Sequence, residues 1–173
     1  MDQPDVKKNI VAYFQSGLHC AEAVVKAVLE SFSRAEEAAI VSRAASGFGG
    51  GIAGSQEELC GAFTGGVMAL SALLGRSQGG QDLRECAKRT AAFKEEFQER
   101  FESLNCGQLM EGFSQSREAY ACVRLTAEAG RMVVAALRQA EKDSGFEFKP
   151  GQDLPREKVA LGTCPFSCGT CSN

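Results

Sequence analysis

The sequence predicts an all-α protein: a compact bundle of about six helices with an irregular C-terminal tail. Apolar residues recur at the i, i+3, i+4 and i+7 spacing of helices along most of residues 1–143. No run of four or more residues alternates between apolar and polar in the manner of a strand. From Ser144 onward, repeated prolines and glycines prevent a long helix. We therefore expect a helical domain over residues 1–143 and a Pro/Gly-rich, cysteine-containing tail over residues 144–173.

Three short helices are predicted first, over residues 2–14, 20–32 and 34–46. Cys20 begins the inward-facing stripe of the second helix. Ser33 is suited to cap the third helix, whose early acidic residues match the positive end of a helix dipole. The third helix then leads into a glycine-rich loop.

The glycine-rich loop and an apolar helix form the centre of the sequence, in the segment FGGGIAGSQEELCGAFTGGVMALSALLG. Ser55 and Glu58 have the spacing of a capping box, which predicts that a helix begins there, with Cys60 on its inward stripe. Glycines in this segment lack a side chain, so a neighbouring helix or a bound group can approach the backbone. The candidate cofactor-binding positions on this basis are Gly49, Gly50, Gly51, Gly61 and Gly65.

Two long amphipathic helices follow, over residues 82–104 and about 118–142. Cys86 lies on the apolar stripe of the first helix and is expected to belong to the core. Cys122 lies on the inward stripe of the second. Between these helices, residues 105–107 (Asn-Cys-Gly) are expected to interrupt the helical chain.

Composition excludes several classes of function. The chain has 173 residues, a net charge of −3 and no basic run, so we do not expect it to bind nucleic acid. It lacks the apolar core of a signal peptide and any stretch approaching about 18 apolar residues, which predicts a cytoplasmic protein without direct membrane insertion. Its single histidine leaves most hydrolytic mechanisms without their usual base. The oligomeric state stays open, and a homo-oligomer is possible.

Eight cysteines are many for a cytoplasmic chain of this size, because reducing conditions disfavour structural disulfides. Free cysteine is also a common core residue, so each one needs a further argument. Four of them begin or end predicted helices or lie on inward stripes, and a small bundle can bring these four near one end. These candidate redox thiols, which are also a candidate first metal site, are Cys20, Cys60, Cys106 and Cys122.

Three chemistries are open to such thiols: a reversible thiol–disulfide pair, a tetrahedral zinc site and an iron–sulfur cluster. None of the four forms a C-x-x-C with another, so any site depends on tertiary assembly. A helix N-terminus and the amides of a glycine loop lower the pKa of a nearby thiol. On this argument Cys20 and Cys60 are suited to be nucleophilic or ligating sulfurs.

These motifs resemble the C_GCAxxG_C_C family of small bacterial and archaeal redox-active proteins, over roughly residues 20–134. Cys20 corresponds to the first cysteine of the family. The ASGFGGGIAG loop and the following CGAFTG, which begins at Cys60, correspond to the central motif, where the family label reads Gly-Cys-Ala and this chain reads Cys-Gly-Ala. Cys106 and Cys122 correspond to the last two cysteines. The resemblance implies an all-α redox or metal-linked protein.

The family is also distantly similar to a domain of split-Soret cytochromes, which bind c-type haem. This chain has no C-x-x-C-H motif, so we expect no covalent haem. Its histidine, His19, precedes Cys20 and either ligates or tunes that thiol or is simply a polar residue at a helix start.

The C-terminal tail carries a second cysteine motif, C-x3-C-x2-C, outside the resemblance. Thiols in a Pro/Gly-rich tail are poor core material. With a fourth ligand from the helical domain or another chain they form a candidate second metal site, or two of them form a disulfide that exchanges with the buried site. The residues of this motif are Cys164, Cys168 and Cys171.

Among these possibilities we favour a metal or iron–sulfur centre for electron transfer over a thiol–disulfide pair, because four inward thiols exceed what a dithiol cycle needs. Zinc is the other metal considered. The alternative function is a non-catalytic helical accessory or adaptor protein whose cysteines are buried or bind structural zinc. The sequence does not identify the redox partner.

Overall fold

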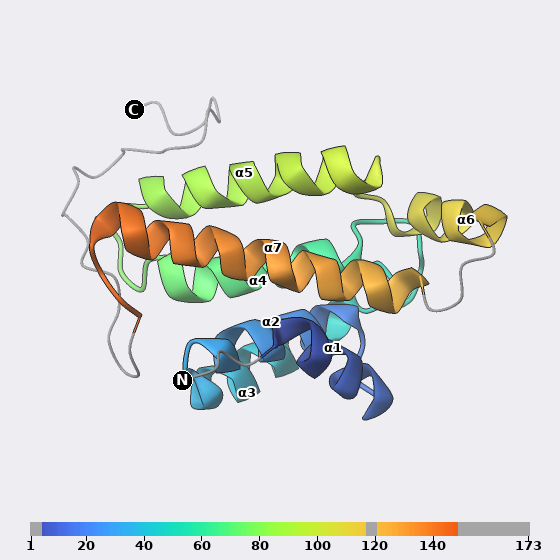
Figure 1. Ribbon diagram of the computed structural model, residues 1–173, viewed down its shortest axis with the longest axis horizontal. Coiled ribbons are helices and arrows are strands. Elements are labelled where there is room, and N and C mark those ends of the chain that lie inside the picture. The colour runs from blue at the N-terminus through green and yellow to red at the C-terminus, as the bar shows by residue number, and fades with distance from the viewer. Residues whose placement is uncertain (1–4, 117–120, 149–173) are drawn as a thin grey trace.

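The computed structural model describes residues 5–116 and 121–148, and it confirms the all-α fold class. Within these ranges no strand forms, and β pairing is limited to an isolated antiparallel bridge between Leu59 and Asn105. A short 3-10 turn, η1 (Ser46–Phe48), leads into the glycine loop. The helices, shown in Figure 1, are α1 (Val6–Gln15), α2 (Cys20–Ser31), α3 (Ala35–Ala44), α4 (Gly61–Leu74), α5 (Arg84–Phe101), α6 (Cys106–Ser116) and α7 (Ala121–Ser144).

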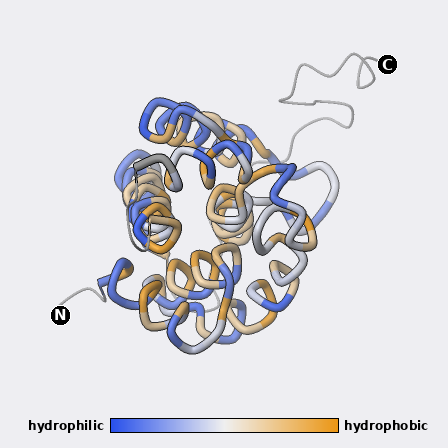
Figure 2. The backbone as a smooth tube through the Cα atoms, turned by 90° about the vertical axis from the view of Figure 1, so that its right-hand side faces the viewer, coloured by the Kyte–Doolittle hydropathy of each residue, from blue (hydrophilic) through white to orange (hydrophobic). Residues whose placement is uncertain are grey.

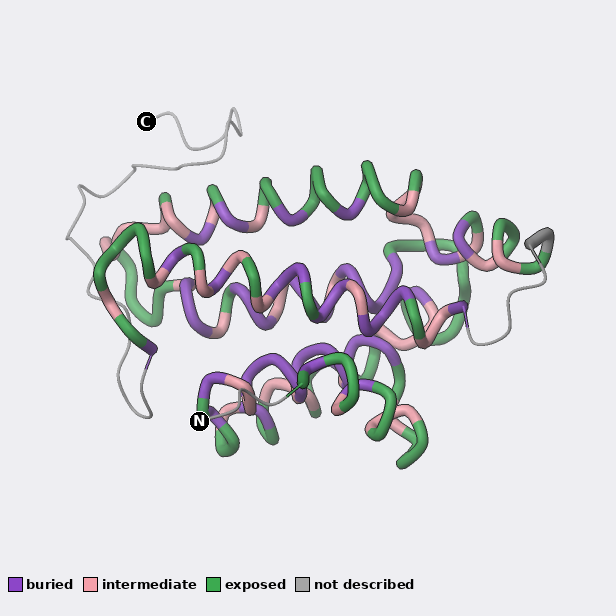
Figure 3. Tube along the Cα trace, in the orientation of Figure 1, coloured by how far each residue is buried: buried purple, intermediate pink, exposed green. Residues whose placement is uncertain are grey.

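Helices α2, α4 and α7 form the centre of the bundle. Helix α2 contacts α1, α3, α4 and α7, and α7 also contacts α1, α4 and α5. Seen end on, the helices surround a common interior, and hydrophilic residues lie mostly on the outer sides (Figure 2). Helix α5 is exposed along one side and buried along the other (Figure 3). Its buried side carries Cys86, Phe93 and Phe97, as the helical spacing predicts.

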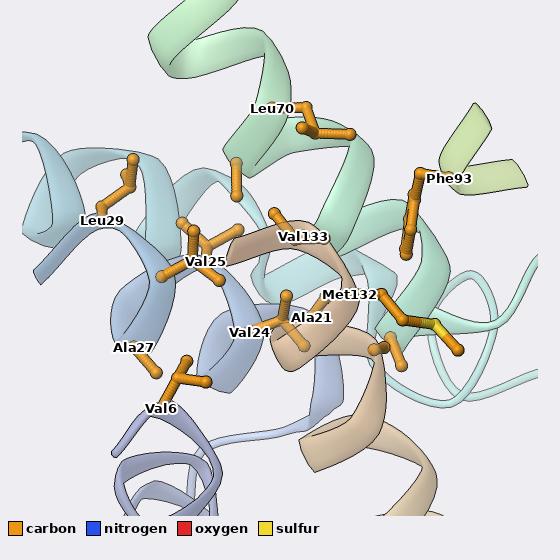
Figure 4. Packing of buried hydrophobic residues seen from close by; sticks show 14 of the residues in the cluster. Val6, Ala21, Val24, Val25, Ala27, Leu29, Leu70, Phe93, Met132 and Val133 are labelled. Atoms are coloured by element: carbon orange, nitrogen blue, oxygen red, sulfur yellow. The ribbon is translucent and has the colours of Figure 1, made fainter. Parts of the chain in front are cut away.

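Helices α2 and α4 pack closely because both carry small or apolar residues around most of their circumference. A Cβ atom on Gly65 would lie 2.6 Å from the carbonyl oxygen of Ala21, so the two backbones are in direct contact there. Figure 4 shows Val25 of α2, Leu70 of α4 and Val133 of α7 in the shared core. Full burial of such a side chain stabilises the fold by roughly 1.5–3 kcal/mol.

Phenylalanine side chains join α4 to α5. Phe63 stacks on Phe93 with ring centroids 5.5 Å apart, and Phe97 packs at an angle against both rings. Phe101 continues the cluster, with its ring centroid 4.7 Å from that of Phe97. Phe97 is completely buried. The apolar stripe predicted for residues 82–104 is therefore the face by which α5 packs on α4.

Helix α6 is an additional helix that the helical spacing of the sequence does not predict. The expected interruption at residues 105–107 is a helix start, because the Asn105 side-chain oxygen accepts a hydrogen bond of 3.0 Å from the Gln108 N–H. This is the geometry of an N-cap. The N–H of Asn105 in turn donates to the Ser103 hydroxyl, at 3.0 Å. The polar residues that suggested a break are thus the cap of an additional helix.

The start of α4 also differs from the prediction. The Ser55 hydroxyl donates to the Glu58 carboxylate, as in a capping box, but both residues remain in the loop. The helix begins at Gly61, with Cys60 as its N-cap. The shift changes the role of Cys60 from a residue inside a helix to the residue that begins one.

Candidate functional site

Three cysteines lie at the beginning of helices, and a fourth lies near the described N-terminal end of α7. Cys20 is the first residue of α2 and Cys106 is the first residue of α6. Cys60 is the N-cap of α4, and Cys122 is the second residue of α7 as described. The N-terminal end of a helix carries a partial positive charge, which favours a thiolate. The four helices are far apart in the sequence, so the fold rather than a local motif assembles this group.

Two backbone hydrogen bonds join the starts of α4 and α6. The N–H of Cys60 donates to the carbonyl of Leu104 at 2.7 Å, and the N–H of Cys106 donates to the carbonyl of Glu58 at 2.8 Å. They flank the isolated β-bridge described above. The bridge therefore fixes Cys60 and Cys106 at neighbouring positions, each at the start of its helix.

Gly61 places the sulfur of Cys20 against the start of α4. A Cβ atom on Gly61 would lie 2.4 Å from Sγ of Cys20 and 2.3 Å from the carbonyl oxygen of Phe48. Both distances are too short for real contacts, so only glycine leaves room for the sulfur. The glycine of the Cys-Gly-Ala motif thus has a packing reason, which is to admit the Cys20 sulfur beside the residue that follows Cys60.

The start of α2 is tied to the segment before the glycine loop. The backbone N–H of His19 donates to one carboxylate oxygen of Glu22 at 2.9 Å, and the Ser46 hydroxyl donates to the other at 2.7 Å. A Cβ atom on Gly49 would lie 2.9 Å from Cβ of His19. His19 is the N-cap residue of α2 and is exposed to solvent. A role for its ring in ligating or tuning Cys20 stays a prediction.

Cys20 is the electrostatic neighbour that the other three thiols share. Burial is the largest cause of a raised pKa at Cys60, Cys106 and Cys122, and interaction with Cys20 raises the pKa of each further. The pKa of Cys60 rises to about 12 and that of Cys122 to about 11. Cys122 likewise interacts with Cys60 and Cys106, so the four thiols lie close enough to influence one another.

The expectation of a low pKa at Cys60 is therefore wrong. The N–H groups of Ala62 and Phe63, in the first turn of α4, do lower this pKa, although Cys60 forms no capping hydrogen bond of normal geometry. The residue is only 4% exposed, and loss of hydration disfavours the charged thiolate more than these N–H groups favour it. The position of Cys60 at a helix start correctly predicts that the N–H groups lower its pKa, but burial raises the pKa by more.

The four thiols differ in access to solvent. Cys20, Cys60 and Cys106 are 5%, 4% and 7% exposed, whereas Cys122 is only partly buried. All four are free thiols. Cys86 lies apart from this group. It is buried in the core, as expected, with its sulfur 3.9 Å from the Ser71 hydroxyl. Cys122 is thus the least buried thiol of the group.

The residues do not form a ready metal site. Across residues 5–116 and 121–148, no three or more His, Cys, Asp or Glu side chains are placed to hold a metal ion. The four thiols have the right chemistry and number for zinc or an iron–sulfur cluster, but no three of them are placed to hold an ion in the described arrangement. The first metal site therefore stays a prediction. The second does too, because Cys164, Cys168 and Cys171 lie outside the described residues.

The glycine loop uses much of its backbone to fold on itself. Gly50, Gly51 and Gly54 have φ angles of 64°, 82° and 75°, in the left-handed region that favours glycine. The N–H of Gly54 donates to the carbonyl of Gly49 at 3.0 Å, and that of Gln56 donates to the carbonyl of Gly50 at 2.9 Å. The two candidate glycines of α4 pack against α2, as described above. These contacts give the glycines a structural role, and cofactor binding by them stays a prediction.

An open groove lies next to the starts of α6 and α7. It is formed by residues of α1, α5, α6 and α7 and has a volume of about 1040 Å³. Leu109 and Leu125 provide apolar lining, Lys7 forms an ion pair with Glu128, and Arg100 is a further cationic group. The sequence does not predict this groove, because its walls come from four separate helices. No local pattern signals such a feature.

Comparison with known proteins places the chain in a family. Over the described ranges, no helix combines the length and the apolar character needed to cross a membrane. No curated protein and no solved structure matches the chain. A family model with the description "Putative redox-active protein (C_GCAxxG_C_C)" matches residues 18–136, which include all four cysteines at the helix starts. Because this match covers more than half of the 173 residues, the chain belongs to the C_GCAxxG_C_C family of redox-active proteins.

Proposed function

We propose that this protein performs thiol-based redox chemistry through a reversible disulfide between Cys20 and Cys122. The family supplies the class of chemistry. The observation that supports this pair is that Cys20 and Cys122 each interact with all of the other thiols in the group, while Cys122 is the least buried of the four. A disulfide exchanges only when an attacking thiolate can reach one of its sulfurs. Cys122 offers that sulfur, and Cys20 is its buried partner.

The raised pKa values fit a reaction in which electrons and protons move together. At neutral pH a raised pKa keeps the Cys122 thiol protonated. Oxidation of Cys20 and Cys122 removes two electrons, releases two protons and forms one S–S bond. Both the dithiol and the disulfide are uncharged, so neither state leaves an uncompensated charge in the buried site. The positive ends of the helices favour the thiolate that exists only during exchange.

A metal centre is the second candidate, and the donor set favours it. Cys20, Cys60, Cys106 and Cys122 are the four thiols that would hold zinc or an iron–sulfur cluster. A cluster supplies one-electron transfer, whereas zinc at four thiolates has a structural role. Because no three of these groups are placed to hold an ion in the described arrangement, binding requires the helix starts to move together.

The remaining proposals concern the setting of this chemistry. We infer a cytoplasmic location, because its reducing conditions keep cysteines such as these available as thiols. A redox partner must supply or remove the two electrons. We propose no role for nucleic acid or membrane insertion, and a homo-oligomer stays possible. An accessory or adaptor protein with permanently reduced cysteines is the non-catalytic alternative.

The test is an anaerobic redox titration of the full chain in dithiothreitol buffers, with disulfides mapped by mass spectrometry after alkylation. We expect a disulfide between Cys20 and Cys122 that is lost in Cys20→Ser. The matched control is Cys86→Ser, which removes a buried cysteine outside the group and should leave this disulfide in place.

Metal and acid-labile sulfide, measured on the same samples, separate the candidates. Stoichiometric metal that disappears in Cys60→Ser would favour the second candidate over the disulfide. Thiols that stay reduced at every potential in a metal-free protein would contradict both candidates and leave the accessory role.

A further inference from the structure

We infer that the cysteines of the C-terminal tail, Cys164, Cys168 and Cys171, pass reducing equivalents to the Cys20–Cys122 disulfide, with the tail seated in the groove beside α6 and α7. This inference rests on the proposed function, because it requires a disulfide in the helical domain. It identifies the immediate partner of that disulfide as a segment of the same chain.

The first reason is access to the thiols. Cys20 is 5% exposed and its sulfur lies against the start of α4, so a folded reductase has little surface at this sulfur to contact. Cys122 is more open but lies at a helix start within the same group. An extended peptide that carries thiols is narrow enough to approach such a position. The tail is the part of this chain that has both the thiols and the composition of an extended peptide.

The groove lies close to the thiols that such a peptide has to reach. Ala121, which precedes Cys122, and Leu125, three residues after it, both line the groove. Leu109, three residues after Cys106, lines it from α6. Residues three apart lie on the same side of a helix. Cys106 and Cys122 do not line the groove themselves, but the groove reaches residues within one helical turn of each.

The lining of the groove suits a peptide. Its apolar walls stand beside the Lys7–Glu128 ion pair and the cation of Arg100. No carboxylate among the described residues pairs with Arg100, which contacts the ring of its neighbour Phe101. The tail mixes apolar residues such as Phe166 with charged and polar ones. The volume of about 1040 Å³ is at the upper end of the range for small-molecule pockets, which leaves room for a short peptide segment.

The tail is long enough to reach. Phe148 ends the described chain, and Cys164 follows 164 − 148 = 16 residues later, a stretch that spans roughly 50 Å when extended. Helix α7 has 24 residues and is roughly 36 Å long. Figure 1 shows the described chain ending near the C-terminal end of α7, opposite α6. The tail thiols can therefore return to the start of α7, and the tether raises their effective concentration to the millimolar range.

The transfer is a pair of exchange reactions. A tail thiolate attacks Sγ of Cys122, which breaks the Cys20–Cys122 bond, forms a mixed disulfide and releases Cys20 as a thiolate that takes up a proton. A second tail thiol, which loses its proton, attacks the tail sulfur of the mixed disulfide and releases Cys122. The helical domain gains two electrons and two protons, and the tail loses the same number and becomes a disulfide. An external dithiol then reduces the tail.

The first test compares a small reductant with a protein reductant on the full chain. The variant Cys164→Ser/Cys168→Ser/Cys171→Ser keeps the tail but removes its thiols. Reduction of the Cys20–Cys122 disulfide by dithiothreitol should change by less than about twofold, because this small dithiol reaches Cys122 unaided. Reduction by a thioredoxin-type dithiol protein should slow by at least about tenfold, because the tethered thiols are lost.

The second test fills the groove without removing a thiol. Gly112 lines the groove from α6, and a Cβ atom there would meet nothing within 4 Å, so Gly112→Trp can be accommodated by the fold. It should slow reduction by the protein dithiol by about tenfold, while the matched control Gly112→Ala should stay within about twofold of the parent. Circular dichroism of both variants confirms that α6 and α7 remain folded.

The outcomes distinguish this inference from the proposed function. If the dithiothreitol titration shows no disulfide in the helical domain of any variant, the proposed function is contradicted. The relay is then contradicted as well. If that disulfide forms but the protein dithiol reduces it equally fast without the tail thiols, only the relay is overturned. Mixing isotopically light and heavy chains shows whether a trapped tail–Cys122 disulfide lies within one chain. A trapped disulfide between chains would overturn the same-chain assignment.

Discussion

The middle of α7 and the start of α7 are built in different ways. In the middle, Ala129 and Val133 are completely buried, and a Cβ atom on Gly130 would lie 2.3 Å from the side chain of Ile10 on α1. At the start, Cys122 is only partly buried and stands beside an open groove. Apolar packing fixes the middle, whereas caps and a few backbone hydrogen bonds fix the neighbouring helix starts. The helix therefore combines a rigid centre that positions the thiols with an end that leaves one of them accessible.

The largest expected effect comes from the packed region alone. Phe97→Ala should lower the free energy of unfolding by about 3–5 kcal/mol, because it removes a completely buried ring between Phe63, Phe93 and Phe101. Urea unfolding under reducing conditions measures the loss. In the folded fraction, disulfide mapping should find the same cysteine pair as in the parent. A changed pair would mean that the two regions are not independent.

Gly61→Ala should affect both regions. The added methyl group would occupy the position of the Cys20 sulfur and the Phe48 carbonyl, so α2 and α4 have to separate. We expect a loss of about 1–3 kcal/mol in urea unfolding, together with faster alkylation of Cys20 as its sulfur becomes exposed. Gly112→Ala is the control, since its methyl group meets open space. Equal stability and equal Cys20 reactivity in the two variants would contradict the proposed contact.

High pH should destabilise the cysteine end through Cys60. Burial raises the pKa of this thiol from 9.0 to about 12, so between these values the unfolded chain releases a proton that the folded protein keeps. The contribution to stability is complete below about pH 9 and is lost as the pH rises toward 12, by at most about 1.4 kcal/mol per pH unit. The free energy of unfolding, measured with urea in the presence of reductant, should therefore decrease less steeply with pH in Cys60→Ser than in the parent. Parallel pH profiles in the two proteins would argue against a buried, protonated Cys60.

The smallest effect is expected at the cap of α6. Asn105→Ala removes the hydrogen bond to the Gln108 N–H and another that the Asn105 amide donates to the carbonyl of Glu57. The cost should be about 1 kcal/mol, and it should appear as faster amide exchange in the first turn of α6. The amides of α2 and α4 in the packed core should exchange at parental rates. Acceleration there as well would show that the helix starts and the core unfold as one unit.

The sequence predicted the packed region well. Helical spacing located the stripe of α5 and the burial of Cys86, because side-chain burial follows directly from the repeat of an α-helix. It also singled out the four cysteines that lie at helix starts. Helix α6 was missed because residues that cap a helix are the same polar residues that break one, and Asn105 was interpreted as a break.

The details of the site depend on contacts that no short pattern contains. The start of α4 was misplaced because Ser55 and Glu58 do pair, but inside a loop in which Ala53 and Gln56 also adopt positive φ angles. The predicted direction of the Cys60 pKa shift is wrong because the argument from the helix dipole leaves out the cost of burying a thiolate, which is the larger effect. The groove is lined by residues of four helices, so the sequence of any one helix does not predict it.

The contact between Gly61 and Cys20 also bears on oxidative damage. Because the Cys20 sulfur occupies the space that a methyl group on Gly61 would need, that side of the sulfur has no room for the two oxygen atoms of a sulfinic acid. Oxidation beyond the disulfide is the irreversible part of cysteine chemistry. On the side that faces Gly61, such oxidation requires α2 and α4 to move apart first. The same glycine that brings the thiol into the site therefore shields one side of its sulfur.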